Sequence, residues 1–235
     1  EFRRVLFRSI VLDEADDATA VGAVAALLDE LRPDVVHNHM YRAELVGTRA
    51  AISLGAIQRR RPYVVSTIHS SRVRSPEDRE VLRHLTPEMD RVIAVSRAIV
   101  RKLEEEGRTG APISLIYNGV DLERYDHQVP CCTLNDEYGF TPGSPLVGVV
   151  ARLEAEKGHP TLLDAWPAVV TAVPEARLLV VGEGSRLEAL VAQAEMLGIS
   201  ASVVFTGRRD DIPAVTKALD VAVLPSYREA QGLTI

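Results

Sequence analysis

The sequence is poor in the residues that mark specialised protein classes. Its only cysteines are two neighbours, Cys131 and Cys132, in a chain of 235 residues. Adjacent cysteines rarely bridge one another, so we expect a reduced, cytoplasmic protein rather than a disulfide-stabilised one. No apolar run approaches the roughly 20 residues that a membrane-spanning helix needs. The net charge of −6 argues against the basic surface of a nucleic-acid-binding protein.

The two ends of the chain do not resemble natural termini. Residues 1–9, EFRRVLFRS, correspond to the translation of a common sequencing adapter, and we exclude them from the fold prediction. The chain has no initiator Met and stops at Leu233-Thr234-Ile235, within a segment that reads as the start of a helix. We therefore expect a fragment of a longer protein.

What the sequence does contain is a regular alternation of strand-like and helix-like segments. The strand-like segments are DVVHNH, YVVSTIH, RVIAVS, ISLIYNGVD, PLVGVVAR, ARLLVVG, SVVFTG and VAVLPS. The helix-like segments span 16–31, 43–54, 76–85, 97–106 (with Ser96 as the expected N-cap), 158–172, 185–197 and 211–219, and another starts at Glu229. Continuous Val and Leu runs separated by helices predict an α/β fold with parallel sheets that are buried on both faces.

The alternation lapses over residues 122–145, which hold Pro130, Pro142 and Pro145 and no sustained apolar period. We interpret this stretch as an interdomain linker. It would separate a partial N-terminal domain, 10–121, from a partial C-terminal domain, 146–235.

Two cations mark the strongest candidate site. Arg152 directly continues the strand VGVVA, and Lys157 precedes a helix that opens at Gly158. In parallel sheets ligands bind at the carboxyl ends of the strands, where both cations lie. The N–H groups and dipole of a helix N-terminus, together with two side-chain charges, predict a site for a diphosphate-sized anion. The alternative is a pair of solvated surface cations.

Glu229 and Gly232 follow the strand VAVLPS at a second predicted strand-to-helix junction. A carboxylate in that place is either favoured only by the helix dipole or part of a ligand site. We prefer the ligand site, because Gly232 lets the backbone approach a ligand closely.

The segment Gly182-Glu183-Gly184 also lies between a strand and a helix. Leu187 stands where a dinucleotide fingerprint has its third glycine, so an oxidoreductase is disfavoured. A tight turn and a backbone lining for a ligand are equally compatible with these residues.

Histidines lie at the ends of the first two predicted strands. His69 ends the strand VVSTI, and we favour a functional role over a purely structural hydrogen bond. His37 and His39 form an H-x-H pattern, which can bind metal, but no third ligand is evident and we expect a structural role. The sequence has no D-x-D motif, which would hold a nucleotide diphosphate through a metal ion.

These motifs together resemble family-4 retaining glycosyltransferases, whose GT-B architecture pairs two Rossmann-like domains across a cleft. The resemblance runs from about residue 34 to residue 235. It depends on segments that occur in family order, namely DVVHNHM, VVSTIHS, VIAVS, LIYNGVDLERY, VVARLEAEKGH, LLVVGEG, VVFTGRRDD and VLPSYREAQG.

The resemblance implies roles for particular residues. The catalytic residues would be Arg152 and Lys157 on the donor diphosphate, Glu229 on the donor sugar as the first carboxylate of an E-x7-E motif, and His69 facing the reacting sugar. The donor-binding residues would be Gly182, Glu183, Gly184, Gly207, Arg208, Gly232, Leu233 and Thr234.

The family pattern is not followed throughout. Ala230 and Gln231 stand before Gly232, where the family usually has glycine directly after the first glutamate. The second glutamate would fall at position 237, and the first strand with its glycine-rich loop would precede Ile10.

The implied activity is retaining transfer of a hexosyl group from a nucleotide diphosphate sugar to a glycan, lipid or small-molecule acceptor. No metal or other cofactor is expected, and the 235-residue chain by itself should bind nucleotide weakly and transfer nothing. The location would be cytoplasmic, with contact at the inner membrane face left open. The alternatives are a nucleotide-sugar-binding protein without turnover and a GT-B-fold sugar-nucleotide epimerase. The donor sugar, base, acceptor and oligomeric state are not identified by the sequence.

Overall fold

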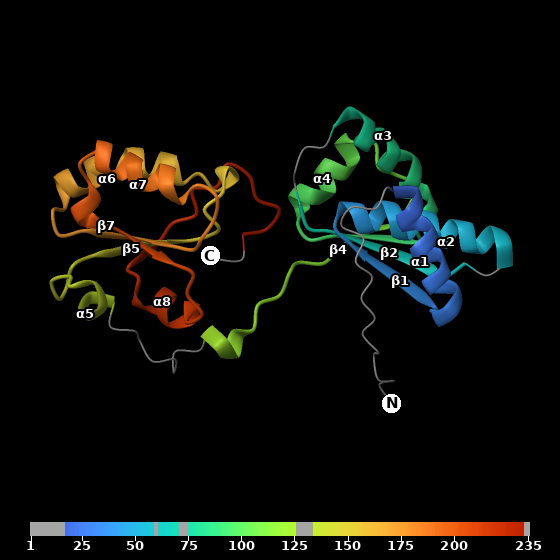
Figure 1. The fold of residues 1–235 in the computed structure, drawn as a ribbon, viewed down its shortest axis with the longest axis horizontal. Coiled ribbons are helices and arrows are strands. Elements are labelled where there is room, and N and C mark those ends of the chain that lie inside the picture. Colours follow the sequence, from blue (N-terminus) through green and yellow to red (C-terminus); the bar gives the residue numbers. More distant parts are fainter. Residues whose placement is uncertain (1–16, 59–60, 71–74, 126–133, 233–235) are drawn as a thin grey trace. The chain divides into compact units, whose positions relative to one another are not determined.

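The structure is a computed structural model that describes residues 17–58, 61–70, 75–125 and 134–232. The chain divides into two compact units, Glu1–Tyr117 and Asn118–Ile235. Each is built on its own four-stranded parallel sheet (Figure 1), which confirms the predicted α/β fold with two parallel sheets. The adapter-like segment 1–9, Cys131, Cys132, Leu233 and Thr234 lie outside the described residues.

The first unit has the strand order β1-β2-β3-β4. Its elements are α1 (Asp17–Leu31), β1 (Val35–His39), α2 (Tyr41–Gln58), β2 (Tyr63–Ile68), α3 (Pro76–Leu85), η1 (Thr86–Glu88), β3 (Arg91–Ala94), α4 (Arg97–Glu105) and β4 (Ile113–Leu115). The N-cap predicted at Ser96 is confirmed, since its Oγ accepts a hydrogen bond from the Ile99 N–H at 3.2 Å. In the β1–β2 pairing, His39 lies opposite Thr67, so the register brings the carboxyl ends of these strands together.

The second unit has the strand order β7-β6-β5-β8. Its elements are η2 (Leu122–Tyr125), α5 (Leu134–Tyr138), β5 (Leu146–Val150), η3 (Ala155–Lys157), α6 (His159–Ala172), β6 (Arg177–Val181), α7 (Leu187–Met196), η4 (Ser200–Ser202), β7 (Val203–Gly207), α8 (Ile212–Ala218) and β8 (Val221–Ala222).

Helices cover both faces of the second sheet. Figure 1 shows α6 and α7 on one face and α5 and α8 on the other. Alternate residues of β6 supply the two cores, because successive side chains of a strand point to opposite faces. Leu178 packs with Trp166 of α6, whereas Leu179 packs with Leu134 of α5 and Val215 of α8.

Three sequence predictions differ from the structure. Within the predicted linker, 122–145, the structure has the short helix α5, whose Leu134 is 1% exposed in the second core, and the units divide earlier, at Tyr117. The strand predicted over VAVLPS is only the two-residue β8. The helix predicted to start at Glu229 is absent from 229–232, which is loop.

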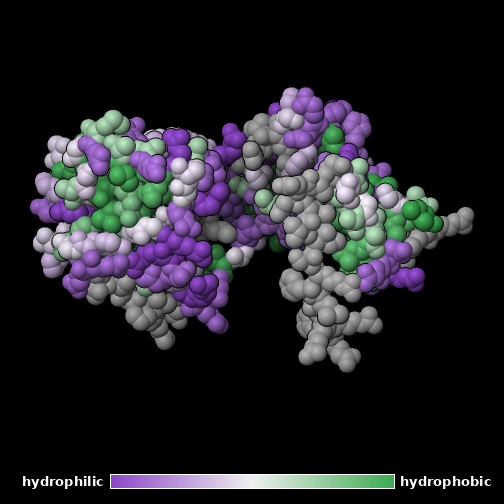
Figure 2. Space-filling view, viewed as in Figure 1, coloured by the Kyte–Doolittle hydropathy of each residue, from purple (hydrophilic) through white to green (hydrophobic). Residues whose placement is uncertain are grey.

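The described surface mixes polar and apolar residues. In Figure 2, hydrophobic surface gathers over the α6–α7 side of the second unit and is bordered by hydrophilic residues. Among the helices that the structure describes, none combines the length and apolar character that crossing a membrane requires.

Candidate functional site

The strand order of the second sheet creates a switch point beside β5. From β5 the chain continues to β6 and β7 on one side, whereas β8 pairs with β5 on the other side. In an open parallel sheet, ligands bind at such a point, in the crevice outside the carboxyl ends of the strands. The segment after β5 carries Arg152 and Lys157, and the segment after β8 carries Glu229. The fold therefore brings these three predicted residues to one place.

Lys157 and Glu229 form an ion pair across the switch point. The Lys157 Nζ lies 2.6 Å from Glu229 Oε1, and their side chains are 18% and 26% exposed. Ser226 donates a second hydrogen bond to the same oxygen at 2.8 Å. Burial alone raises the pKa of Glu229, but the hydrogen bonds from Lys157 and Ser226 outweigh it and the pKa lies below its ordinary value. Glu229 is therefore ionised at neutral pH, and the pair is lost only in acid.

Arg152 presents its guanidinium to solvent beside this pair. Its side chain is 69% exposed and its Nη2 lies 3.0 Å from Glu156 Oε1 on the next turn of the loop. An exposed pair of this kind contributes little to stability. Arg152 can therefore transfer to an anionic ligand at low cost, on the loop that leads to the N-terminus of α6.

The two loops of the site are joined through their backbones. Gly158 adopts the left-handed conformation (φ 69°) as the N-cap of α6, and a Cβ there would lie 2.0 Å from the carbonyl oxygen of Pro225. The Tyr227 N–H donates to the Glu156 carbonyl at 3.0 Å, and the Tyr227 hydroxyl lies 2.7 Å from Thr161 Oγ1. These contacts join the loop that carries Lys157 to the loop that carries Glu229.

Alanine at Gly158 should destabilise the second unit by roughly 1–3 kcal/mol from the left-handed backbone alone, and more from the clash with Pro225. Gly198 provides the matched control, since its φ is 67° and a Cβ there would meet nothing within 4 Å. Urea unfolding followed by the fluorescence of Trp166, which is buried in α6, measures both variants. Equal losses for Gly158→Ala and Gly198→Ala would contradict the close approach between the loops.

The predicted Gly182-Glu183-Gly184 segment packs against the β5 loop. A Cβ on Gly182 would lie 2.1 Å from the Ala151 carbonyl oxygen, and one on Gly184 would lie 2.5 Å from that of Leu153. The Leu153 N–H also donates to the Glu183 carbonyl at 2.9 Å. Close packing between loops therefore accounts for both glycines, and a donor-binding role for this segment stays a prediction.

The predicted Gly207-Arg208 pair lies at the end of β7, two strands away from β5. The Arg208 side chain is 73% exposed. The next residue, Arg209, is instead held by Asp211 and Glu137 at 2.7 and 2.6 Å, and these hydrogen bonds raise its pKa. Arg209 thus ties α5 to α8, whereas Arg208 makes a long, exposed pair with Asp210 (3.6 Å).

A residue outside the sequence prediction holds the Glu229 loop. Gln231 accepts a hydrogen bond from the Asn118 N–H at 2.7 Å and donates to the Asn118 carbonyl at 3.3 Å. Its amide therefore pairs with the first residue of the second unit as a strand neighbour would. At Gly232 a Cβ would lie 2.6 Å from Leu224 Cδ2, so the Leu224 side chain would have to shift to admit it. The predicted donor-binding residues Leu233 and Thr234 lie outside the described residues.

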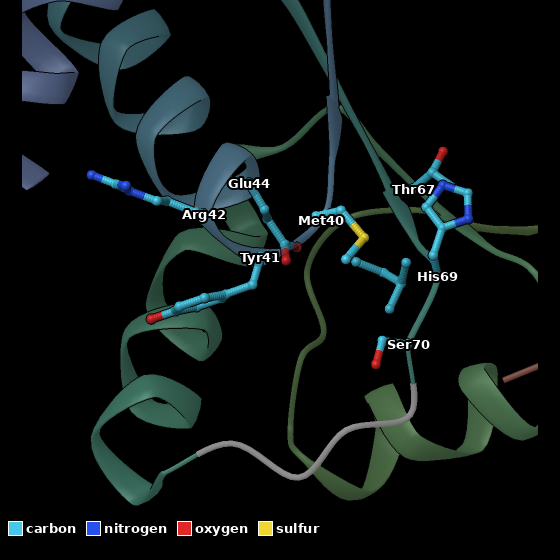
Figure 3. A pocket seen from close by; sticks show the side chains of 8 residues that line it. Met40, Tyr41, Arg42, Glu44, Thr67, His69 and Ser70 are labelled. Carbon is cyan, nitrogen blue, oxygen red and sulfur yellow. The ribbon is translucent and has the colours of Figure 1, made fainter. Parts of the chain in front are cut away.

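The predicted His69 lies in the first unit, where it lines a pocket of about 310 Å³. Met40, Tyr41, Arg42 and Glu44 line one side of the pocket, and residues 67–70 line the other (Figure 3). Met40 has the unusual positive φ of 73°, a backbone strain that is typical of functional sites.

His69 is the third member of a histidine cluster. His39 Nδ1 lies 2.9 Å from His69 Nε2, and the two rings stack with centroids 5.2 Å apart. The His37 ring lies 4.1 Å from that of His39. Burial, and then the charge on His39, lowers the pKa of both His37 and His69. In the part of the chain that the structure describes, no cluster of His, Cys, Asp or Glu has a geometry suited to a metal ion.

Two family models match the chain. Residues 3–124 match Glycosyltransferase Family 4, and residues 133–235 match Glycosyl transferases group 1. The two Rossmann-like units are those of GT-B glycosyltransferases, and the chain belongs to glycosyltransferase family 4.

Individual relatives agree with this assignment. The 2-deoxystreptamine N-acetyl-D-glucosaminyltransferase of Streptomyces fradiae is 30% identical, over 94% of this chain and 56% of its own length. A GDP-mannose-dependent monoacylated alpha-(1-6)-phosphatidylinositol monomannoside mannosyltransferase of Corynebacterium glutamicum is 28% identical, over 68% of this chain and 42% of its own length. The crystal structure of Anabaena HepE in complex with UDP has a TM-score of 0.74 and 25% sequence identity, over 88% of this chain and 56% of the HepE chain. The chain spans about half the length of the relatives it matches.

Proposed function

We propose that the whole protein is a retaining hexosyltransferase that moves a sugar from a nucleoside diphosphate donor to a glycan, lipid or small-molecule acceptor. The observation that carries the proposal is the convergence of Arg152, Lys157 and Glu229 at the switch point of the second sheet. A similar structure, that of HepE, was determined in complexes with UDP and with UDP-glucose, which supports a nucleotide-sugar donor.

In this proposal the site stabilises the departing diphosphate. Negative charge grows on the diphosphate as the bond between the anomeric carbon and the phosphate oxygen breaks. Arg152, Lys157 and the N-terminus of α6 supply positive charge at that position before the reaction begins, so little reorganisation is required. Glu229, which now binds Lys157 at 2.6 Å, accepts hydrogen bonds from the donor sugar when Lys157 turns to the diphosphate.

The acceptor hydroxyl attacks from the face that the diphosphate leaves, which retains the anomeric configuration. A bond forms between the acceptor oxygen and the anomeric carbon, and the hydroxyl proton passes to the leaving phosphate oxygen. For His69 the family resemblance implies a contact with the reacting sugar, and that role is part of the proposal. The low cysteine content supports a cytoplasmic location, which is part of the same proposal.

A donor screen tests the function. The protein is expressed from its complete reading frame and incubated with UDP- and GDP-hexoses and with a lipid-linked or an aminocyclitol acceptor, the kinds that the relatives' names suggest. Each donor is incubated separately, so that a product of the expected mass identifies the donor whose sugar is transferred, and the NMR coupling at the anomeric carbon gives the configuration. Nucleotide binding without donor cleavage would instead indicate a binding protein, and a changed sugar on an intact nucleotide would indicate an epimerase.

Transfer should continue in the presence of excess EDTA. Arg152, Lys157 and the helix N-terminus supply the charge that a divalent ion would otherwise bring to the diphosphate. The initial transfer rate should agree, within experimental error, between EDTA and Mg²⁺ buffers. A rate that collapses in EDTA and returns with Mg²⁺ or Mn²⁺ would contradict metal independence.

A further inference from the structure

The histidine cluster contains a hydrogen bond that constrains where protons can lie. His39 Nδ1 and His69 Nε2 face each other at 2.9 Å. Two neutral imidazoles can make this bond only when one facing nitrogen carries a proton and the other does not. The hydrogen bond therefore couples the tautomers of His39 and His69.

The ring of His39 has a second neighbour on its own strand, the ring of His37. The His37 ring lies 4.1 Å away from it by centroid, and His37 Nε2 is itself 2.7 Å from Thr67 Oγ1. Thr67 is the residue opposite His39 in the β1–β2 register. The pairing of the two strands thus sets the geometry from which His39 approaches His69.

One proton arrangement suits both residues. Free neutral histidine prefers its proton on Nε2. A His69 that donates from Nε2 to the bare Nδ1 of His39 leaves both rings in that preferred tautomer. In the opposite arrangement both rings carry the less favourable Nδ1 proton.

We propose that His39 is a positioning residue that holds His69 in the Nε2–H tautomer, so that the free Nδ1 of His69 accepts a hydrogen bond from a substrate hydroxyl. The contact with substrate rests on the proposed function, whereas the tautomer does not. His69 lines the pocket at the carboxyl end of β2 (Figure 3). An Nδ1 without a proton cannot donate, so His39 decides the direction of any hydrogen bond made there.

Nitrogen NMR of the 235-residue chain with ¹⁵N-labelled histidine tests the tautomer without reference to activity. His69 should show a protonated Nε2 and a bare Nδ1, with a scalar coupling from its Nε2 to His39 Nδ1 across the hydrogen bond. A protonated Nδ1 on His69 would overturn the proposal.

Variants separate positioning from simple packing. His39→Phe keeps a ring but removes the acceptor, so the two ¹⁵N shifts of His69 should move toward their averaged values. His39→Asn places an amide oxygen near the position of Nδ1 and should restore the wild-type shifts. His84→Asn is the control, since the contacts of His84 among the described residues lie within α3, to the Glu80 carbonyl and carboxylate. Unchanged His69 shifts in a folded His39→Phe variant would also overturn the proposal.

Kinetics in the protein from the complete reading frame then test the consequence. His39→Phe should lower kcat by about tenfold or more, because a misplaced group at the reacting centre costs rate, while the KM for the donor changes little. His39→Asn should recover most of kcat. An absence of transfer by the wild type would refute the proposed function but leave the NMR result standing. A full kcat in His39→Phe would refute the positioning role.

Discussion

Replacing Lys157 with alanine should lower kcat/KM for sugar transfer by roughly 30- to 1,000-fold, which corresponds to about 2–4 kcal/mol of transition-state stabilisation. Lys157 directly precedes the N-cap of α6, and its ammonium group lies 2.6 Å from Glu229, where charge on the diphosphate is proposed to grow. Its loss removes a charge that needs no rearrangement during the reaction. Initial rates at varied donor concentration, in the protein from the complete reading frame, measure the effect.

Lys102→Ala is a matched control for this variant. Lys102 also pairs with a glutamate, Glu106, at 2.7 Å and is 16% exposed, but it lies within α4 and takes no part in the proposed site. Its loss should leave kcat/KM within about twofold, because neither Lys102 nor Glu106 belongs to the proposed site and their pair does not contribute to transition-state binding. Turnover of Lys157→Ala within about threefold of wild type, far below the usual cost of losing one charge-stabilising donor, would show that the diphosphate site is placed wrongly.

Part of the proposed donor site could be predicted from the sequence, because it follows from a local sequence pattern. Arg152 and Lys157 stand directly after a strongly apolar strand and before a helix, and parallel strands place such residues on one edge of the sheet. Glu229 lies near them because β8, which pairs in parallel with β5, ends at the same edge of the sheet. Here the short-range pattern and the topology agree.

Long-range pairing explains what the sequence did not indicate. The contact between His39 and His69 depends on the register of β1 against β2, which no local pattern specifies. Helix α5 has only five residues, too few for a helical period to emerge from its composition. The loop at Glu229 is held by Gln231 on Asn118, 113 residues away in the chain, so a local helix signal was overridden by a tertiary contact.

An ion pair inside the first unit is another long-range contact that the local sequence pattern did not indicate. Arg108, directly after the turn that ends α4, and Glu44 of α2 form a hydrogen-bonded ion pair, with side chains that are 1% and 2% exposed. The Arg108 Nε also donates to Thr86 Oγ1 at 3.1 Å. One guanidinium therefore connects α2, η1 and the end of α4. A buried charge is tolerated only when its partners are present.

Arg108→Met should lower the free energy of unfolding of the first unit by about 3–5 kcal/mol, because it removes the buried Arg108 cation from the carboxylate of Glu44. The double variant Arg108→Met/Glu44→Leu should recover much of that loss, since replacing both partners by apolar groups is often neutral. Arg42→Ala is the control on the same helix, where the pair with Asp17 is long (3.9 Å) and exposed, and it should cost at most about 1 kcal/mol.

Two probes distinguish the unfolding of the first unit from that of the second. The single tryptophan, Trp166, is 1% exposed in the core of the second unit, so its fluorescence reports that unit and should keep its midpoint in Arg108→Met. Amide hydrogen exchange in α2 and α4 reports the first unit and should show the loss of protection. If the free energy of unfolding of the first unit falls by less than about 1 kcal/mol, the range of an exposed pair, water must solvate Glu44 once the guanidinium is gone. The charge pair would then hold α2 and α4 together far less than its burial implies.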